Sequence, residues 1–377
     1  MAFTVTLADA ADVSSVGGKA ASLGELSRAG VTVPPGFAVT VEAFTAALAT
    51  VDADGARRAG IEALSAGDLA GIAVAAGGLR ALVAGAPLPG AVVAAIEAGY
   101  AALTAGVGGP GAPDVAVRSS ATVEDSAEAS FAGLQDTYLG VSGASSVLDH
   151  VQRCWASLYN DESVAYRRRL ALPEAGVAMA VVVQRMVAPR AAGVMFTRSP
   201  VTGDRSVVAI EGTWGLGSAL VSGDVTPDSW VISKITGEIT TRRVSAKLKI
   251  HRYAPNDGLA SPGPSPGSSA GPDVASADQG GARVTVADTP AELRDAPCLS
   301  DDEIRALAAV ARRVEAHYGA PQDIEWAVLD GDAEPSARVV LLQSRPETVW
   351  AARGSAPAGA PKPRAADHVL ALFGKPL

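Results

Sequence analysis

The spacing of apolar residues changes near residue 178, and this change constrains the fold more than any other feature of the chain. Upstream, residues 41–105 and 145–170 have a helical pattern, with Trp155 and Tyr159 on one side of the second stretch. Downstream, short segments alternate apolar and polar residues, which is typical of strands that bury one face. We therefore expect an α+β protein whose first part is rich in helices and whose second part is built on a sheet.

This division predicts two domains and a tail within the 377 residues of the chain. The expected boundaries are residues 1–177 for the first domain, 178–350 for the second and 351–377 for a linker-like tail. Residues 255–283 consist almost entirely of Pro, Gly, Ser, Ala and Asp. Because such a segment cannot bury enough apolar area to offset the entropy of ordering, we expect a disordered surface loop there.

Glycines are expected to divide the helices of the first part. Residues 19–29 have the pattern of a short helix that follows Gly17 and Gly18. Gly30 suits the left-handed conformation that ends many helices. The pair Gly77–Gly78 predicts a break within the long helical stretch.

The chain is acidic, with 31 Lys and Arg against 40 Asp and Glu and a formal net charge of −9. This balance argues against a broad surface for nucleic acid or anionic membrane, so any anion site has to be local. The longest apolar stretch, near residues 176–187, falls well short of the roughly 18 residues of a membrane span. The N-terminus lacks the pattern of a secretory signal, and we expect a cytoplasmic protein. Cys154 and Cys298 are expected to be buried thiols rather than metal ligands.

Two basic residues stand where a phosphate would be bound. Lys19 follows two glycines at the start of a helix, where an ammonium opposes the helix dipole unless an anion is present. Arg118 ends a short apolar strand and precedes about a dozen small, hydroxylated or acidic residues, among which Ser130 and Gly133 allow close approach of backbone to a polyphosphate. The alternatives are a solvated lysine on a turn and an arginine at a strand edge.

The two last predicted strands, DIEWAVL and RVVLLQSR, carry the most informative geometry. Asp323 and Glu325 are two residues apart and share one face of the first strand, and Gln343 and Arg345 share one face of the second. If the strands pair as a hairpin, two carboxylates, an amide oxygen and a guanidinium meet at one patch, which suits a nucleotide-bound Mg²⁺. A surface ion pair of Arg345 with one carboxylate is the alternative. The residues expected on the opposite, core faces are Ile324, Trp326, Val328, Val340 and Leu342.

Seven stretches of the chain are similar to the motifs of one family, in the family's order. They are GGKAASLGEL at 17–26, VPPGFAVT at 33–40, AVRSSATVEDSAEASFAGLQDTYLGV at 116–141, VVVQRMVAPRAAGVMFTRSPVTGD at 181–204, EGTWGLGSALVSGDVTPDSW at 211–230, DIEWAV from 323 and LLQSRPETVW from 341. Residues 14–350 thus resemble the N-terminal ATP-binding domain of phosphoenolpyruvate synthases, pyruvate phosphate dikinases and rifampin phosphotransferases. The resemblance implies an ATP-grasp fold, with nucleotide bound between an N-terminal mixed subdomain and a C-terminal antiparallel-sheet subdomain.

The resemblance also implies a role for individual residues in binding ATP and Mg²⁺. The catalytic phosphate-binding residues it implies are Lys19, Arg118 and Arg345, and the metal ligands are Glu325 and Gln343. The nucleotide contacts it implies are Gln184, Met186, Val187, Ser130, Gly133, Thr137, Glu211 and Asp323. Residues 119–135 correspond to a glycine-rich lid that closes over the phosphates and excludes water.

Full-length members of the family carry a histidine on a swivelling domain, and none of the four histidines of this chain has a similar context. We therefore expect an enzyme subunit that transfers phosphoryl groups from MgATP to a histidine on a separate partner subunit, with AMP and phosphate formed overall. This arrangement resembles that of phenylphosphate synthases, so the final small-molecule acceptor on the partner is a phenol or alcohol, or pyruvate. We expect no nucleic-acid or membrane partner. The alternative is a nucleotide-sensing module without catalysis, which should have lost metal ligands that this chain retains.

Overall fold

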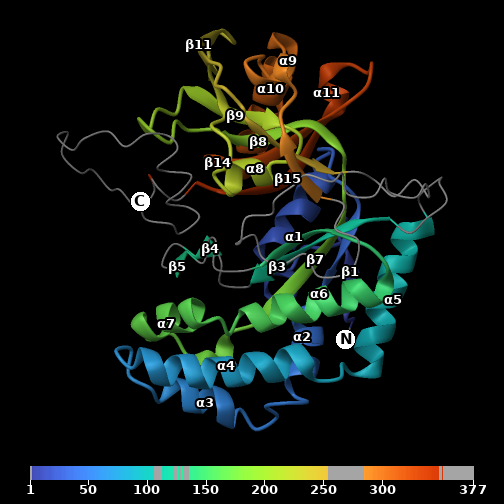
Figure 1. Ribbon diagram of the computed structural model, residues 1–377, viewed down its shortest axis with the longest axis vertical. Helices are drawn as coiled ribbons and strands as arrows, with labels where there is room; N and C mark the ends of the chain where they lie inside the picture. Colours follow the sequence, from blue (N-terminus) through green and yellow to red (C-terminus); the bar gives the residue numbers. More distant parts are fainter. Residues whose placement is uncertain are drawn as a thin grey trace.

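The computed structural model describes residues 2–105, 113–121, 125–126, 129–130, 136–253, 284–347 and 350. These residues form helices and antiparallel sheets, as expected for an α+β protein, arranged in a helix-rich lower part and a sheet-rich upper part (Figure 1). The expected disordered loop 255–283 and the expected tail 351–377 lie outside the described residues.

The lower part is built on a five-stranded antiparallel sheet in the order β1-β2-β7-β3-β6. Helices cover one face of this sheet, where Val117, Val183 and Trp155 lie in one large apolar cluster. The strands are β1 (Thr4–Thr6), β2 (Gly36–Val39), β3 (Val115–Ala121), β6 (Thr137–Val141) and β7 (Met179–Arg185). The helices are α2 (Val41–Leu48), α3 (Ala56–Glu62), α4 (Leu69–Gly85), α5 (Gly90–Ala105), α6 (Ala144–Ser157), α7 (Asp161–Arg169) and the 3₁₀ turn η1 (Glu174–Gly176).

Two expectations about this part are wrong. Strand β7 was expected to open the second domain, but it pairs with β2 and β3, so a division by sheet membership falls after Arg185 rather than after residue 177. Helix α4 continues through Gly77 and Gly78, because Ile72, Ala76, Leu79 and Val83 remain buried along one side of it. Burial of this stripe outweighs the modest helix-interior cost of two glycines.

Helix α1 (Val13–Arg28) lies between the two parts of the molecule (Figure 1). It begins earlier than expected, with the Asp12 side chain capping its first turn, and it bends at Gly17, whose φ is 74°. The last turn ends as expected, with Gly30 at a φ of 71°. Ala20 and Leu23 pack on the five-stranded sheet while Leu26 belongs to the core of the upper part, so α1 joins the two.

The upper part is built on a six-stranded antiparallel sheet in the order β11-β10-β9-β8-β14-β15. One face of it packs on helix α10 through a core that includes Trp230, Trp326 and Leu307. The strands are β8 (Pro189–Phe196), β9 (Val207–Trp214), β10 (Asp228–Ser233), β11 (Ile239–Arg243), β14 (Gln322–Leu329) and β15 (Val339–Pro346). The helices are α8 (Ser218–Val221), α9 (Ala291–Arg294), α10 (Asp301–Tyr318) and α11 (Pro335–Arg338).

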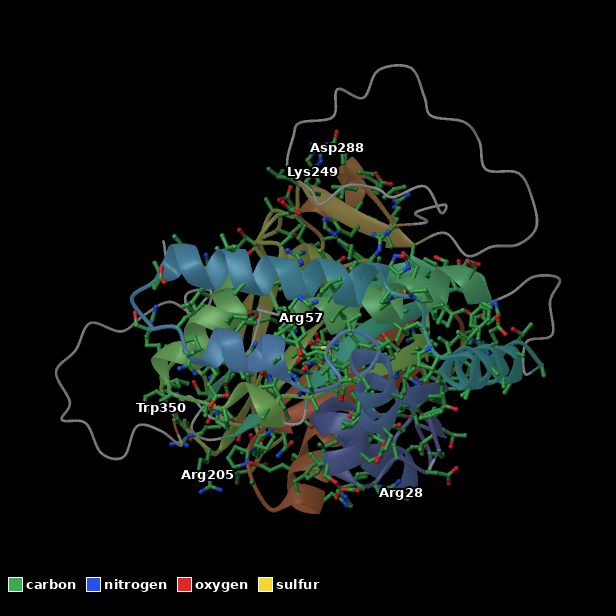
Figure 2. The ribbon with its side chains drawn as sticks, turned by 90° about the horizontal axis from the view of Figure 1, so that it is seen from below. Arg28, Arg57, Arg205, Lys249, Asp288 and Trp350 are labelled. Atoms are coloured by element: carbon green, nitrogen blue, oxygen red, sulfur yellow. The ribbon has the colours of Figure 1, made fainter. Side chains whose placement is uncertain are left out.

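Two smaller hairpins complete the described structure. Strands β12 (Lys249–Tyr253) and β13 (Val284–Asp288) pair with Tyr253 opposite Val284. Figure 2 shows Lys249 and Asp288 together at the outer end of this hairpin, where their charged groups are 2.8 Å apart. Strands β4 (Asp125–Ser126) and β5 (Ala129–Ser130) form the other pair.

Among the described residues no single helix has the length and apolar composition to cross a membrane. Helices α4 and α5 meet these criteria only jointly, as a pair bent by 66°.

Candidate functional site

Strands β14 and β15 pair as predicted and bring four polar side chains to one face of the six-stranded sheet. Asp323 lies opposite Arg345, and Glu325 lies opposite Gln343. On the next strand, β8, Val194 lies opposite Glu325, and on the strand after it, β9, Glu211 lies opposite Val194. The other face holds Ile324, Trp326 and Val328, which are fully buried in the core, as the alternation predicts. We call the first face the site face.

A β-bulge in this hairpin corrects one prediction. The register shifts between Glu325 and Trp326, so that Trp326 lies opposite Leu341 and residue 342 is the extra residue of β15. Leu341 and Val339 therefore enter the core, and Leu342, which was expected there, is only half-buried. The carbonyl of Leu342, the extra residue of the bulge, accepts a hydrogen bond from Arg118.

Arg118 reaches this hairpin from the other sheet. Its Nη2 donates hydrogen bonds to Glu325 Oε2 and Gln343 Oε1, both at 2.8 Å, and its Nη1 donates to the carbonyl of Leu342 at 3.0 Å. Strand β3 does not end at Arg118 as expected but runs to Ala121, with Ser119 and Ser120 buried. Residues 119–121 of the predicted lid are thus part of a paired strand, and most of the remainder, up to residue 135, lies outside the described residues.

Lys19 is placed by a close contact between α1 and β3. At the bend of α1, a Cβ on Gly17 would lie 1.9 Å from the carbonyl oxygen of Ser120, so only glycine fits there. The Ser120 hydroxyl accepts a hydrogen bond from the Ala20 amide at 3.2 Å and donates to the Val16 carbonyl at 2.9 Å. This contact sets Lys19, two residues beyond the bend and half-buried, on the same side of the sheet as Arg118.

The two carboxylates of the hairpin have pKa values displaced in opposite directions. Burial raises the pKa of Asp323 above its ordinary value, although the charge and hydrogen bond of Arg345 act in the other direction. Burial also disfavours the charge on Glu325, but there the charges of Arg118 and Arg345, the Arg118 hydrogen bond and the charge of Lys19 prevail and lower its pKa. Glu325 is therefore ionised, with cations directed at it from both sheets.

Glu211 and Thr213 are two further polar residues on the site face. Glu211 is 7% exposed, and burial raises its pKa to about 7. Thr213 lies two residues along β9, and its hydroxyl is buried without a hydrogen-bond partner in the structure. The sequence analysis missed Thr213, although its i+2 spacing from Glu211 was a signal for it. Two buried polar groups on the same face of one strand make this part of the site face a candidate ligand surface.

The remaining predicted contacts lie on the five-stranded sheet or directly after one of its strands. Gln184 is buried at the end of β7, and its side chain donates to the Pro34 carbonyl at 3.2 Å. Met186 and Val187 follow it, half-buried, with the Met186 amide bonded to the Asp114 carbonyl at 2.9 Å. Thr137 is exposed on β6, directly opposite Arg118. Two predicted contacts in the lid are not part of this geometry: Ser130 lies in β5, where its side chain is not described, and Gly133 lies outside the described residues.

The donor set at Glu325 and Gln343 fits a hard divalent cation carried by a nucleotide. One carboxylate oxygen and one amide oxygen already converge on a single positively charged nitrogen, at 2.8 Å each. Mg²⁺ in nucleotide sites takes one or two protein oxygens and completes its shell with water and phosphate. Among the described residues there is no cluster of three or more His, Cys, Asp and Glu side chains that could hold a metal ion. Such a cluster would be a metal site formed by protein ligands alone, which differs from a site that shares the metal with a nucleotide.

Comparison with known proteins shows the family of the chain. Residues 13–265 and 269–365 match the family model described as the pyruvate phosphate dikinase AMP/ATP-binding domain. The chain belongs to this family. The matched ranges include every predicted site residue and every strand of the two sheets except β1.

Similar curated proteins come from bacteria and archaea. The chain is 42% identical over 343 residues to a rifampicin phosphotransferase of a Streptomyces species, covering 90% of this chain and 35% of that protein. It is 40% identical over 337 residues to a probable phosphoenolpyruvate synthase of Methanothermobacter thermautotrophicus, covering 89% and 44%, and 41% identical over 341 residues to a phosphoenolpyruvate synthase of Aeropyrum pernix, covering 89% and 41%. The chain thus spans less than half the length of these relatives.

Proposed function

We propose that this chain is an ATP-grasp unit that binds MgATP between its two sheets and donates phosphoryl groups. The observation that carries the proposal is the meeting of Arg118, from the five-stranded sheet, with Glu325 and Gln343 of the six-stranded sheet. Phosphate-binding cations and metal-binding oxygens converge there from separate elements. A mere surface ion pair would not require the amide oxygen or a Glu325 pKa lowered by three cations.

Each residue has a defined task in this proposal. Lys19, Arg118 and Arg345 neutralise the phosphate oxygens as charge develops on the transferring group. Glu325 and Gln343 would hold the Mg²⁺, which would neutralise negative charge on the phosphates. Asp323 fixes Arg345, whose Nε and Nη2 donate to Asp323 Oδ2 at 2.9 and 2.8 Å. A guanidinium held at two points presents its remaining donors in one orientation.

The rest of the nucleotide is assigned to the flanking elements. The segment from Gln184 to Val187 contacts adenine, while Glu211 lines the site face beside it. Thr137 and the segment that follows residue 121, with Ser130 and Gly133, cover the phosphates. The protonated Glu211 carboxyl and the Thr213 hydroxyl each offer a hydrogen bond to the sugar or base, which would satisfy two buried polar groups.

The proposed acceptor of the phosphoryl group is a histidine on a separate partner subunit, with AMP and phosphate formed overall. Support for phosphoryl transfer comes from the relatives, which are named as synthases and phosphotransferases and whose additional length leaves room for a histidine-bearing domain. The final acceptor is a phenol or alcohol, or pyruvate. A nucleotide-sensing module without catalysis is the second candidate, and it is favoured only if metal-dependent binding occurs without any transfer.

The test follows label from ATP to protein. The chain is incubated with Mg²⁺, ATP labelled at the β- or γ-phosphate and a histidine-bearing subunit encoded near it. We expect acid-labile, base-stable label on the partner's histidine and release of AMP, and neither product with Arg345→Ala. Tight MgATP binding with no labelled partner and no AMP would favour the sensing module.

A further inference from the structure

A single nitrogen of Arg118 lies where the two proposed metal ligands converge. Its Nη2 is 2.8 Å from Glu325 Oε2 and 2.8 Å from Gln343 Oε1, while Nη1 is anchored on the Leu342 carbonyl at 3.0 Å. Both oxygens are therefore at the same distance from one nitrogen of the positively charged guanidinium group. If Mg²⁺ bound to the same two oxygens, each oxygen would have to come closer, to a metal–oxygen distance of about 2.1 Å.

The guanidinium is held in surroundings that make it costly to remove. The side chain of Arg118 is 12% exposed and that of Glu325 is 30% exposed, so water screens their attraction only in part. Withdrawing Arg118 with no replacement would leave the half-buried carboxylate of Glu325 without the cation that is hydrogen-bonded to it. Another cation at the same point would restore the balance.

We propose that Arg118 and a divalent cation compete for the oxygens of Glu325 and Gln343, so that the arginine occupies the metal position until a polyphosphate attracts it away. The inference rests on the proposed nucleotide function of the site. Arginine forms strong charge-assisted hydrogen bonds to phosphate, so a nucleotide offers it a new partner as the metal takes its old ones. Metal and polyphosphate then bind cooperatively, and the chain without nucleotide holds divalent metal weakly.

Simple charge repulsion is the rival explanation, because any nearby cation disfavours a metal ion. Lys19 supplies the matched control, since its charge also lowers the pKa of Glu325. Removal of either cation changes the net charge by one, but removal of Arg118 also removes hydrogen bonds to both Glu325 and Gln343. Arg118→Lys keeps the charge and loses the planar fork that holds two oxygens at once.

The test measures Mn²⁺ bound to the purified chain by electron paramagnetic resonance, without nucleotide. Arg118→Met should bind Mn²⁺ at least about tenfold more tightly than the wild type, Arg118→Lys about threefold, and Lys19→Met less than about threefold. The double variant Arg118→Met/Glu325→Gln should lose the gain. Circular dichroism and thermal melts establish that each variant is folded.

Two results would overturn the proposal. Equal gains in Mn²⁺ affinity in Arg118→Met and Lys19→Met would mean that net charge alone explains the effect. A gain in Mn²⁺ affinity that persists when Glu325→Gln is added would mean that the metal binds elsewhere. If Arg118→Met does not fold, Arg118→Lys decides, and a wild-type affinity in that variant contradicts the competition. Calorimetry of MgATP with the wild-type chain tests the proposed function separately. Failure to bind MgATP would refute that function, whereas the ranking of the Mn²⁺ affinities still decides whether Arg118 occupies the metal position.

Discussion

The two sheets contribute different sets of charged groups to the proposed site. The five-stranded sheet and α1 supply Arg118 and Lys19, whereas the six-stranded sheet supplies acidic and amide oxygens together with Arg345. Asp323 is neutralised within its own hairpin, by Arg345, but Glu325 is neutralised from the other sheet, by Arg118. The difference indicates that one ion pair builds the hairpin and the other joins the sheets at the point where ligands are proposed to bind.

The largest expected effect tests whether each of the two parts of the molecule has its own stabilising ion pair. Arg167 and Glu174 are buried in the lower part, and Lys247 and Asp228 are buried in the upper part, at 2.9 and 2.7 Å. Glu174→Gln and Asp228→Asn should each lower the free energy of unfolding by about 3–5 kcal/mol, because each leaves a buried cation unpaired. Urea denaturation measures the loss.

The exposed pair Lys249–Asp288 provides the control for both variants. Asp288→Asn should leave the denaturation midpoint unchanged, because exposed pairs contribute little. A loss of stability in one of the two buried-pair variants but not in the other would show that only one part of the molecule depends on its buried ion pair.

The second effect concerns pH and belongs to the six-stranded sheet alone. The pKa of Glu211 rises from 4.5 to about 7 on burial. The folded chain therefore keeps a proton that the unfolded chain loses, and this stabilising contribution is complete below pH 4.5 and is lost as pH rises through 7. Between pH 4.5 and 8 the wild type should lose about 3 kcal/mol of stability relative to Glu211→Gln.

Denaturation at the two pH values checks this, with the exposed Glu292→Gln as the control that should follow the wild type. An identical pH dependence for wild type and Glu211→Gln would mean that Glu211 is ionised in the folded chain.

The third effect separates ligand binding from folding on strand β14. Glu325→Ala should weaken MgATP binding about 30-fold, or about 2 kcal/mol, yet leave ATP binding in EDTA within about threefold of the wild type. Isothermal titration calorimetry measures both affinities. Glu334→Ala, which removes the same charge at the exposed turn of the same hairpin, should bind like the wild type. Equal losses with and without Mg²⁺ would refute a metal role for Glu325.

The smallest effect concerns the hairpin at the edge of the upper part. Tyr253 and Val284 are paired, so residues 254–283 connect two ends that already lie together. Deleting residues 258–280 should change the free energy of unfolding by only about 1 kcal/mol, the loop-closure contribution, and leave ATP affinity intact. A fall of the melting temperature by many degrees would show that this segment contributes to the core.

Much of the site face could be predicted from alternation along single strands. The i, i+2 spacing placed Asp323 with Glu325 and Gln343 with Arg345, and the structure pairs them as expected. The bulge at residue 342 was not predictable in this way, because it depends on how two strands are aligned with each other. The sheet to which β7 belongs was missed for the same reason, because the alternation of residues along a strand does not show which strands it pairs with.

The contact of Arg118 with Glu325 lay furthest beyond sequence reasoning. The two residues are 207 positions apart, and their distance is set by the way α1 joins the two sheets. The resemblance to the family implied that both residues bind the same MgATP, but their direct hydrogen bond is seen only in the structure.

The central claim is most directly tested by a crystal structure of the chain with Mg²⁺ and a non-hydrolysable ATP analogue. The account predicts electron density for the metal between Glu325 Oε2 and Gln343 Oε1, with the Arg118 guanidinium moved onto the phosphates and Lys19 and Arg345 beside it. Nucleotide bound elsewhere, or bound with Arg118 still on Glu325 and the metal held by other residues, would contradict it.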